Sequence, residues 1–450
     1  MKIGKLNQVK CNATGNADSR YKMLLIYPSQ LLKGKIHKSK KPMMYGLALP
    51  LIAALTPPEF GIKITDEIVE DINFEEKTDM VGLSVTTVNA PRAYQIADEF
   101  RSRGARVVMG GMHPSVLPEE AGQHADSVVI GEAEGVWGEL IEDFKKGELK
   151  PLYRGELVRD LGTLPMPRRD LVKKDKYEVL FEPVQTTRGC PFACDFCAVS
   201  KFYGRTYRYR PIEKVVEEIK VSGSKHIFFV DDNIAADYRY SMELFEALVP
   251  LKLKWISQAN ITIAQKPDLC KMASKSGCIA LLIGLESINS QSLASIGKTF
   301  NKVEDYRRSF RVLRKNGIIA IASMILGLDT DDVNVFDSTA KFLQETRVPL
   351  TELYFPVPYP GTELYDRLER EGRIRERDWS NYISEVVFQP KQMSMTDLDE
   401  GLWKAYEGFY SVPSIMSRLL LPPHRHILTA LLANLIHRNS VKRRVQPLLG

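Results

Sequence analysis

The hydrophobic and polar positions of the chain divide it into two regions in which short apolar runs alternate with amphipathic segments. In the first region, apolar runs at 22–27, 62–67, 81–85, 107–109 and 127–130 predict strands, and segments at 47–55 and 91–103 have the apolar spacing of helices. Strands that alternate with helices form parallel sheets, so we expect a doubly wound α/β domain here.

The second region repeats this alternation. Six runs predict strands, at 184–188, 226–230, 254–259, 280–283, 318–325 and 351–357. Helical segments near 211–222, 239–249, 266–276, 303–316 and 333–346 separate them. Right-handed crossovers between six parallel strands predict a second doubly wound sheet or a partial barrel, with its working face at the carboxyl ends of the strands.

These patterns predict an α/β protein in five parts. A basic segment covers 1–20, a Rossmann-like parallel domain 21–150, a linker 151–180, a partial (β/α)6 barrel 181–370, and a helical extension with a basic tail 371–450. The linker contains LPMPRRD (164–170), whose two prolines keep the chain extended.

Composition and charge exclude several classes of protein. The 450 residues are 44% hydrophobic and 26% charged, which is ordinary globular usage and excludes a disordered or fibrous chain. The net charge of +6 belongs to the ends: residues 1–41 hold ten bases and one acid, and residues 408–450 hold six bases and no acid. A nucleic-acid partner is therefore not expected. No apolar run is long enough to span a bilayer and no secretory leader is visible, so we expect a cytoplasmic protein.

Several residues of the first domain fall at the ends of predicted strands, where parallel sheets bind ligands. They are Ser84, Gly110, Gly111, Gly131 and Glu132. Glycine after a strand is also ordinary turn chemistry, so a ligand site and a set of turns are equally good interpretations. No GxGxxG follows the first strand, which disfavours a nicotinamide site. His113 could ligate a metal, but a hydrogen-bonding role in a turn is the favoured interpretation.

Three of the six cysteines lie within eight residues, directly after the first strand of the second region. Cys190, Cys194 and Cys197 have the spacing CxxxCxxC. No fourth Cys or His is nearby to complete a structural zinc site, whereas three thiolates can hold three irons of a 4Fe-4S cluster and leave the fourth iron open. The sequence therefore predicts an iron-sulfur cluster rather than zinc or three unrelated cysteines.

The cluster loop, RGCPFACDFCAVS (188–200), resembles that of the radical S-adenosylmethionine (SAM) superfamily. Within it, the chain is similar over residues 20–370 to the cobalamin-dependent group that includes the hopanoid and bacteriochlorophyll methylases and the anaerobic Mg-protoporphyrin cyclase. Further family-like motifs are GGMHPSVLPEE (110–120), GEAEG (131–135), LPMPRRD, FVDDN (229–233), IGLES (283–287) and PYPGT (358–362). The resemblance implies three cofactors: a 4Fe-4S cluster, SAM and cobalamin.

The resemblance also implies roles for individual residues. The three cysteines would ligate the cluster, whose open iron chelates SAM. The residues that would contact SAM are Phe196 beside the adenine, Asp231 and Asp232 at the amino group, Gln258 and Glu286 at the ribose or carboxylate, and Gly327 by close backbone approach. A helix cap is the alternative for the two aspartates. Tyr359 and Thr362 are candidates to line the substrate cavity, and a PxPG turn would explain the same segment.

By the same resemblance, Ser84, Gly110, Gly111, Gly131 and Glu132 would bind cobalamin. Cobalamin domains of the older type have DxHxxG after the first strand, and their His ligates cobalt. This chain has YPSQLLKGKIHK (27–38) at that place, in which His37 lacks the neighbouring Asp and Gly. We therefore expect cobalamin to bind with its lower base displaced and without a His ligand.

The function implied is that of an oxygen-sensitive methyltransferase. A 5′-deoxyadenosyl radical would take hydrogen from an unactivated carbon of an apolar substrate, such as a lipid or tetrapyrrole, and methylcobalamin would supply the methyl group. A flavodoxin- or ferredoxin-type donor would supply electrons. Cyclisation or another redox rearrangement without methyl transfer remains open, as does a cobalamin sensor or carrier. A tRNA methylthiotransferase is disfavoured, because its first domain would need three further cysteines and only Cys11 is present.

The C-terminal extension carries two further expectations. Residues 371–410 are rich in aromatic residues and are expected to pack on the barrel. Residues 411–450 alternate apolar stretches with basic residues, which suits peripheral contact with an anionic membrane surface. A terminal helix docked on its own domain is an equally good interpretation.

Overall fold

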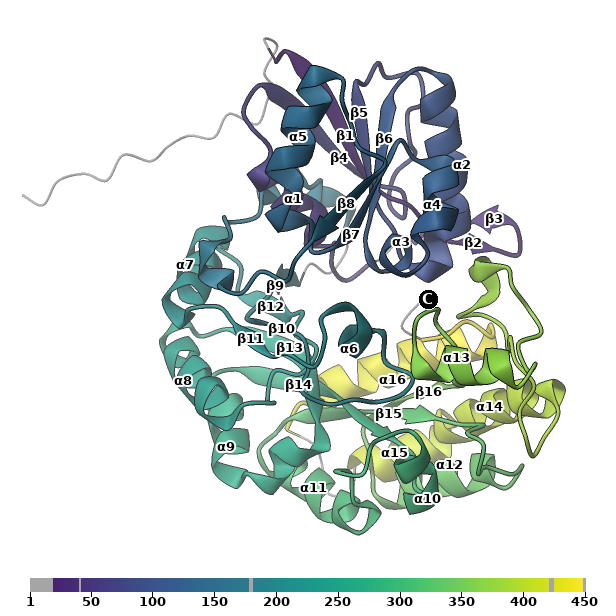
Figure 1. Ribbon diagram of the computed structural model, residues 1–450. Helices are drawn as coiled ribbons and strands as arrows, with labels where there is room; N and C mark the ends of the chain where they lie inside the picture. The colour runs from purple at the N-terminus through teal and green to yellow at the C-terminus, as the bar shows by residue number, and fades with distance from the viewer. Residues whose placement is uncertain (1–18, 40–41, 178–180, 421–424, 448–450) are drawn as a thin grey trace, which may run out of the picture.

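The computed structural model describes residues 19–39, 42–177, 181–420 and 425–447. It consists of two α/β units stacked one above the other, with three helices of the C-terminal extension against the lower unit (Figure 1). The α/β class, the parallel sheets and the helical C-terminus are those that the sequence predicts, and the fold prediction is confirmed.

The first unit is built on a six-stranded parallel sheet. Its strands are β1 (Tyr21–Tyr27), β4 (Phe60–Asp66), β5 (Met80–Ser84), β6 (Arg106–Gly110), β7 (Ser127–Gly131) and β8 (Leu152–Gly155), in the spatial order β4-β1-β5-β6-β7-β8. The small hairpin of β2 (Leu31–Leu32) and β3 (Lys35–Ile36) follows β1. Strand β8 is too short to show a hydrophobic pattern, and it extends the sheet into the segment that the sequence predicts to be a linker.

Helices cover both faces of this sheet, because its strands have apolar side chains on both sides. Met23 and Leu25 of β1 face α1 (Ala48–Leu55) and α5 (Trp137–Lys146). Leu24 and Ile26 face α2 (Ala90–Ser102) and α4 (Pro118–His124). The short helix α3 (Met112–Val116) stands at the carboxyl end of β6.

The second unit is a six-stranded parallel sheet of the partial-barrel type. Its strands are β9 (Glu182–Val184), β12 (His226–Phe229), β13 (Lys254–Asn260), β14 (Cys278–Glu286), β15 (Ile319–Ile325) and β16 (Leu350–Tyr354), and each pairs with the next along the chain. Helices α7 (Ile212–Ser222), α8 (Tyr238–Leu248), α9 (Pro267–Lys275), α10 (Ser290–Ser295), α11 (Val303–Lys315), α12 (Val335–Glu345) and α13 (Glu363–Arg370) accompany them. The predicted strand at 184–188 is divided, because β10 (Thr187–Arg188) leaves the sheet to pair with β11 (Arg208–Tyr209).

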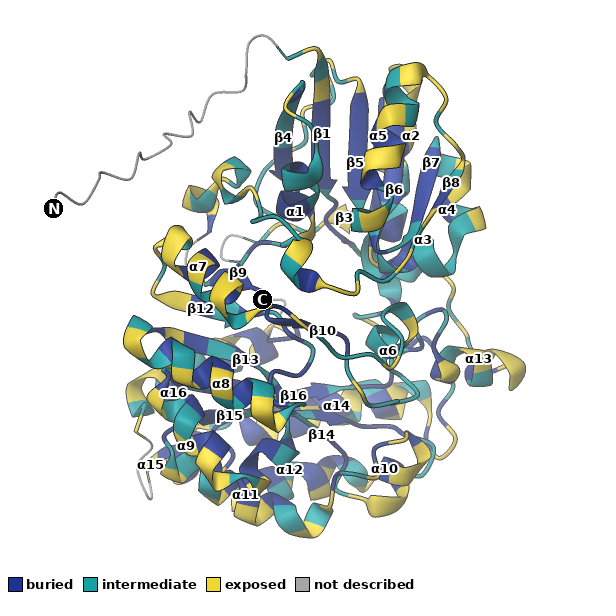
Figure 2. Cartoon of the chain, turned by 60° about the vertical axis from the view of Figure 1, so that its left-hand side comes forward, coloured by how far each residue is buried: buried dark blue, intermediate teal, exposed yellow. Residues whose placement is uncertain are grey.

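Short elements complete the chain trace. Helix α6 (Ala198–Phe202) follows the cluster loop and lies between the two units in both views (Figures 1 and 2). The 3₁₀ helices are η1 (Thr87–Asn89), η2 (Ala133–Gly135), η3 (Leu161–Thr163), η4 (Arg169–Leu171), η5 (Lys174–Lys176), η6 (Val249–Leu251), η7 (Ile261–Gln265) and η8 (Trp379–Asn381).

The C-terminal helices are α14 (Met395–Phe409), α15 (Val412–Leu420) and α16 (Ile427–Lys442). Helices α14 and α16 pack against β16, the last strand of the barrel, and α15 packs against α12, α14 and α16. The Tyr406 hydroxyl donates to the carbonyl of Leu353 at 3.0 Å, and the Tyr410 hydroxyl to that of Thr351 at 2.8 Å. The aromatic residues of α14 therefore pack on the barrel as predicted. Trp379 is different, because its indole N–H donates to Glu120 of the first unit at 2.9 Å.

Candidate functional site

The cluster loop is held in place by three other segments of the chain and by one hydrogen bond of its own. It runs from Gly189 to Cys197 between β10 and α6. The backbone N–H of Gly189 donates to Asp232 Oδ2 at 3.0 Å, that of Asp195 to the carbonyl of Ile296 at 3.2 Å, and that of Cys197 to Cys194 at 3.1 Å. The Asp195 carbonyl accepts from the N–H of α13 residue Leu364 at 3.0 Å. Gly189 has a φ of +87°, and a Cβ there would lie 2.4 Å from the Thr206 carbonyl, so only glycine fits.

The three cysteines of this loop are half-buried, and none of them forms a disulfide. Burial raises the pKa of each thiol, and that of Cys194 to about 12, while the positive charge of Lys298 acts in the opposite direction. The negative charge of a Cys197 thiolate also raises the pKa of Cys190 and of Cys194, as expected for thiols that lie close together. A bound metal reverses this preference, because coordination deprotonates a thiol outright.

The donor set fits a cluster better than a single ion. Among the described residues, no three His, Cys, Asp or Glu side chains are arranged to hold one metal ion. In a 4Fe-4S cluster each thiolate binds a different iron, so the three sulfurs need not converge on one point. Three thiols would hold three of the four irons and leave the fourth for a small molecule.

The two aspartates that follow β12 differ in their contacts. Asp231 is buried, and its carboxylate accepts from the backbone N–H groups of Thr186 and Thr187, each at 2.7 Å, and from the Thr186 hydroxyl at 2.6 Å. Burial raises its pKa to about 6. It therefore fastens the segment between β9 and β10, whereas Asp232 Oδ2 accepts from Gly189 at the root of the cluster loop. Neither aspartate caps a helix.

The remaining predicted SAM residues lie at the carboxyl ends of β13, β14 and β15. Gln258 is near the end of β13, and its carbonyl accepts from the N–H of Ile234 at 3.0 Å. Glu286 ends β14 with a φ of +67°, and its carboxylate forms a buried ion pair with Lys298. Gly327 follows β15 with a φ of +90°, and a Cβ there would lie 2.5 Å from a methyl carbon of Leu398.

Lys298 is a residue of this site that sequence reasoning missed. Its side chain is only 5% exposed, it pairs with Glu286, and its charge acts on all three cysteines. Glycine at position 284 leaves room for this ion pair. A Cβ there would lie 2.6 Å from the Glu286 carboxylate and would displace it. The local sequence IGKTF (296–300) carries no signal for this role, because it depends on the turn that returns α10 to the cluster loop.

The five predicted cobalamin residues line one cavity of about 330 Å³ at the carboxyl ends of β5, β6 and β7. They are Ser84, Gly110, Gly111, Gly131 and Glu132. The deep end is apolar and includes Leu25, Leu49 and Trp137. Gly111 has a φ of +121°, and a Cβ there would lie 2.4 Å from the Val85 carbonyl. The backbone of Gly111 therefore lies directly against the end of β5 at the wall of this cavity, where only glycine fits.

Glu132 lines this cavity, but its carboxylate is occupied by the second unit. It accepts from both terminal nitrogens of Arg208, at 2.7 and 2.9 Å, and from the backbone N–H of Val158 at 2.5 Å. Burial by itself raises the pKa of Glu132, but the hydrogen bonds from Arg208 and the charge of Arg188 outweigh it, and the pKa lies below its ordinary value.

A second cavity, also of about 330 Å³, lies between the two units. The first unit contributes residues of η1 and α3, and the second contributes α6 and the segment after β16. Tyr359 lines this cavity. Thr362 does not: it is buried and caps α13, with its hydroxyl accepting from the N–H of Tyr365 at 3.2 Å.

Two histidines, His113 and His37, lie in segments where a metal or cobalt ligand could stand. His113 is buried and its Nε2 lies 2.9 Å from the Tyr94 hydroxyl, which fits the hydrogen-bonding interpretation. His37 is absent from the residues that line the two cavities, none of which is a His. Cys11 lies outside the described residues. Cys270 and Cys278 are buried in the barrel core.

Comparison with known proteins assigns the two units. The B12 binding domain model matches residues 53–141, the radical SAM superfamily model matches 184–343, and a domain of unknown function, DUF4070, matches 362–424. The bacteriochlorophyllide d C-12(1)-methyltransferase of Chlorobaculum tepidum is 31% identical over 89% of this chain and 90% of its own length. The chain belongs to the cobalamin-dependent radical SAM methyltransferase family.

More distant relatives carry other names. The hopanoid C-2 methylase of Rhodopseudomonas palustris is 25% identical over 82% of this chain and 73% of its own length. The anaerobic magnesium-protoporphyrin IX monomethyl ester cyclase of Cereibacter sphaeroides is 24% identical over 75% of this chain and 60% of its own. The structure of the cobalamin-dependent SAM radical enzyme OxsB with aqua-cobalamin covers 94% of this chain and 72% of OxsB, with 16% identity and a TM-score of 0.67, and it shares the fold.

The resemblance read from the sequence is thus confirmed. This radical SAM methyltransferase uses a 4Fe-4S cluster, SAM and cobalamin, and enzymes of the family need a reductant. The cluster loop lies within the radical SAM match, and the ends of β5, β6 and β7 lie within the B12-binding match.

Proposed function

We propose that this methyltransferase acts on an unactivated carbon of an apolar substrate of the tetrapyrrole class. The observation that carries the proposal is the lining of the cavity between the two units, which consists of Thr86, Thr87, Val88, Met112, Val116, Ala198, Lys201, Phe202, Tyr359 and Pro360. Lys201 is the only charged residue among them. Such a lining favours an apolar molecule, and Lys201 suits one that carries a carboxylate.

The position of this cavity also supports the proposal. Helix α6, which contributes Ala198, Lys201 and Phe202, begins directly after Cys197. Thr86 and Met112 line both this cavity and the one at the ends of β5, β6 and β7. A substrate here would lie between the two cofactor regions. When bound, SAM and the cluster supply a hydrogen-abstracting 5′-deoxyadenosyl radical, and cobalamin supplies the methyl group.

Roles for individual residues follow as part of this proposal. Cys190, Cys194 and Cys197 would hold the cluster. Phe196, which packs against Ile296, Ile325 and Leu328, would give the adenine an apolar neighbour. The other groups proposed for SAM are Asp232, Gln258, Glu286 and the backbone of Gly327, with Asp231 holding the strand segment behind the loop. Ser84, Gly110, Gly111 and Gly131 would border the nucleotide tail of cobalamin.

The substrate class is tested with the full chain, reconstituted under anaerobic conditions with SAM and either dithionite or a flavodoxin- or ferredoxin-type protein, our proposed donor. We expect S-adenosylhomocysteine together with 5′-deoxyadenosine when a chlorophyllide-type tetrapyrrole is added, and not with a hopanoid. Methyl transfer to the hopanoid alone would contradict the substrate class. 5′-Deoxyadenosine alone with the tetrapyrrole would favour the cyclase-like alternative, which one relative's name suggests.

A cavity-filling variant tests the location. Val88→Trp adds bulk to the cavity wall and should lower methyl transfer at least about tenfold while SAM binding is retained. Val221→Trp, on the exposed face of α7, is the matched control and should leave the rate unchanged. Equal rates for the two variants would place the substrate elsewhere.

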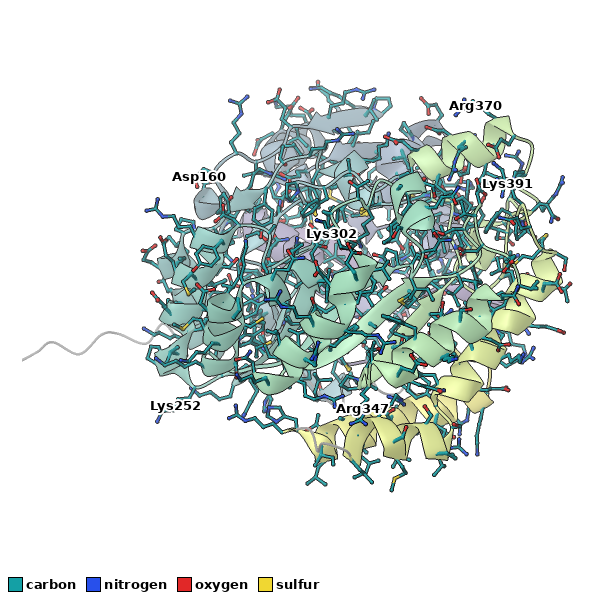
Figure 3. The ribbon with its side chains drawn as sticks, turned by 90° about the horizontal axis from the view of Figure 1, so that it is seen from below. Asp160, Lys252, Lys302, Arg347, Arg370 and Lys391 are labelled. Atoms are coloured by element: carbon teal, nitrogen blue, oxygen red, sulfur yellow. The ribbon has the colours of Figure 1, made fainter. Side chains whose placement is uncertain are left out.

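We also propose that α15 and α16 make peripheral contact with an anionic membrane. One face of α16 is docked on the barrel through Ala430, Asn434 and His437. Its other face leaves apolar side chains exposed at helical spacing, namely Leu428, Leu432, Leu435 and Ile436, and α15 adds Val412, Met416 and Leu420. Figure 3 shows the two yellow helices along one edge of the molecule, with side chains pointing outward. No described helix is long and apolar enough to cross a membrane.

Charge supports an anionic surface rather than a neutral one. Arg425, Lys442, Arg443 and Arg444 are exposed around α16, and residues 408–450 contain no acid. Basic residues beside an apolar stripe add about 1 kcal/mol each at an anionic lipid surface. An apolar substrate dissolved in the membrane would then be delivered near the enzyme.

Sedimentation with vesicles tests this contact. The chain should pellet with phosphatidylglycerol vesicles but not with phosphatidylcholine vesicles, and Leu432→Ser with Leu435→Ser should release it. Val221→Ser, which removes an equally exposed apolar residue from α7, should not. Pelleting that the α16 variant does not change would overturn the proposal. These substitutions are preferable to removal of α15 and α16, which would also remove Arg418 and its buried hydrogen bonds to the carbonyls of Val348, Pro349 and Phe409.

A further inference from the structure

We propose that Arg188 is a positioning residue that couples the cluster loop to the cobalamin cavity through buried ion pairs with Glu132 and Glu134. The inference rests on the proposed function, because it takes the cluster to be held by Cys190 and its neighbours. It assigns Glu132 to contact between the two units instead of direct contact with cobalamin.

The ion pairs join the two units at their functional ends. Arg188 Nη2 lies 2.6 Å from Glu134 Oε1, and Arg188 Nη1 lies 3.3 Å from Glu132 Oε1. Arg208, the antiparallel partner of Arg188 across β10 and β11, binds the same Glu132 carboxylate at 2.7 Å. Gln185 completes the contacts of Arg188 by accepting from its Nε at 2.7 Å.

Burial makes this network different from a surface salt bridge. The side chains of Arg188, Arg208, Glu132 and Glu134 are 7%, 10%, 2% and 9% exposed. A buried charge that loses its partner is strongly destabilised, because it has already lost its hydration. Neither unit can therefore move at this point without exposing or separating charges, and the two units are held in one relative position.

The network is only a few backbone atoms from both cofactor regions. Arg188 is followed by Gly189 and then by Cys190, the first cysteine of the cluster loop. Glu132 follows Gly131, and Arg188, Glu132 and Glu134 themselves line the cavity at the ends of β5, β6 and β7. The backbone of Gly131 packs tightly on β8, since a Cβ there would lie 2.4 Å from the Gly155 carbonyl.

This arrangement predicts that the two cofactors bind cooperatively. When the cluster forms, it fixes the loop and therefore Arg188, which in turn fixes the Glu132 and Glu134 side of the cobalamin cavity. Coupling between two binding sites is reciprocal, so cobalamin must favour cluster assembly by the same factor by which the cluster favours cobalamin. We expect a factor of about ten, within the usual range for coupled sites.

The experiment measures cobalamin affinity of the full chain before and after cluster reconstitution, by equilibrium dialysis with hydroxocobalamin. In the wild type, cluster assembly should lower the Kd about tenfold. In Arg188→Gln the two Kd values should be equal, and Arg188→Lys should restore part of the difference. A simple loss of stability would weaken binding in both states and leave their ratio unchanged.

Two further variants keep the test decisive. Glu134→Gln removes the network from the cobalamin side and should also abolish the difference, even if Arg188→Gln impairs the cluster loop. Arg92→Gln breaks a buried ion pair with Glu67 that lies wholly inside the first unit, and it should retain the tenfold ratio. A ratio near ten in Arg188→Gln and Glu134→Gln, or its loss in Arg92→Gln, would overturn the inference. Failure of the wild type to bind either cofactor would instead refute the proposed function.

Discussion

Gly111 offers a direct test of how the backbone shapes the cobalamin cavity. Its φ of +121° and ψ of −172° belong to a region that is essentially restricted to glycine, and a side chain there costs roughly 1–3 kcal/mol. The substitution Gly111→Ala adds a second penalty, because the new Cβ would lie 2.4 Å from the carbonyl oxygen and 2.9 Å from the nitrogen of Val85. Those are backbone atoms at the end of β5, so relief requires the strand end to move.

Gly104→Ala is the matched control for the first of these penalties. Gly104 lies in the same unit, in the turn between α2 and β6, with a φ of +89°, and a Cβ added there would have no atom within 4 Å. Its substitution by alanine should therefore cost only about 1 kcal/mol of unfolding free energy. We expect Gly111→Ala to cost about 3 kcal/mol or more, which corresponds to a fall in Tm of roughly 6–12 °C if about 150–250 residues unfold together.

The assay is thermal unfolding of both variants without ligand, followed by cobalamin binding at a temperature where each is folded. Because Gly111 lines the cavity and Gly104 does not, Gly111→Ala should also weaken cobalamin binding at least about tenfold, and Gly104→Ala should bind like the wild type. Equal losses of stability in the two variants, or unchanged cobalamin affinity in Gly111→Ala, would refute the argument from close backbone approach.

Three other predictions concern the barrel. Cys197→Ala should lose the visible absorbance of the cluster and all SAM cleavage. Cys270→Ala, in a buried core helix, should retain both. Cluster absorbance of normal intensity in Cys197→Ala would contradict the ligand assignment. Arg418→Leu should lower the unfolding free energy in urea by about 3–5 kcal/mol, because the buried guanidinium donates to three backbone carbonyls. Those of Val348 and Phe409 would lose this partner, whereas that of Pro349 keeps the Asn434 amide. A loss under about 1 kcal/mol would contradict this reasoning. Burial raises the pKa of Glu352 to about 8, above its unfolded value, so its contribution to stability is lost as the pH rises. His437 opposes this trend up to about pH 7.5, because its pKa is lowered to about 4 in the folded state while the unfolded imidazole still loses its proton near pH 6.5. Between pH 6.5 and 8 the unfolding free energy of the wild type should therefore fall relative to that of Glu352→Gln by up to about 1.4 kcal/mol per pH unit, because both proteins share the contribution of His437. Parallel pH profiles for the two proteins would contradict the reasoning.

The sequence was sufficient to predict most elements of both units. Parallel strands are continuous apolar runs, and glycine ends several of them, so runs such as 127–130 were visible without any tertiary information. The carboxyl ends of parallel strands meet at one edge, and this rule alone brings Ser84, Gly110 and Gly131 to a common cavity. Strand β8 was missed because four residues at an edge carry too little pattern.

The functions of side chains at those strand ends were harder to predict, because they depend on partners distant in sequence. Thr362 is a polar residue after the last strand, as a cavity residue would be, yet it caps α13. Lys298 is an ordinary lysine until the fold places it beside Glu286 and the cysteines. Periodicity places a residue on an element, but it does not say which other element packs against it.

Glu132 shows why this matters in an enzyme with two cofactor domains. Considered within the first unit alone, an acid that follows a glycine at a strand end is a reasonable ligand for cobalamin. Its carboxylate is instead bound by Arg208, 76 residues away, and lies close to Arg188 beside the cluster loop. In this enzyme the carboxyl edges of the two parallel sheets face each other. Opposite charges from the two units therefore meet at the same edges at which parallel sheets bind ligands. A charged residue at such an edge should therefore be assigned to the facing domain first, and to the cofactor only where the hydrogen-bonding capacity of its side chain is left open.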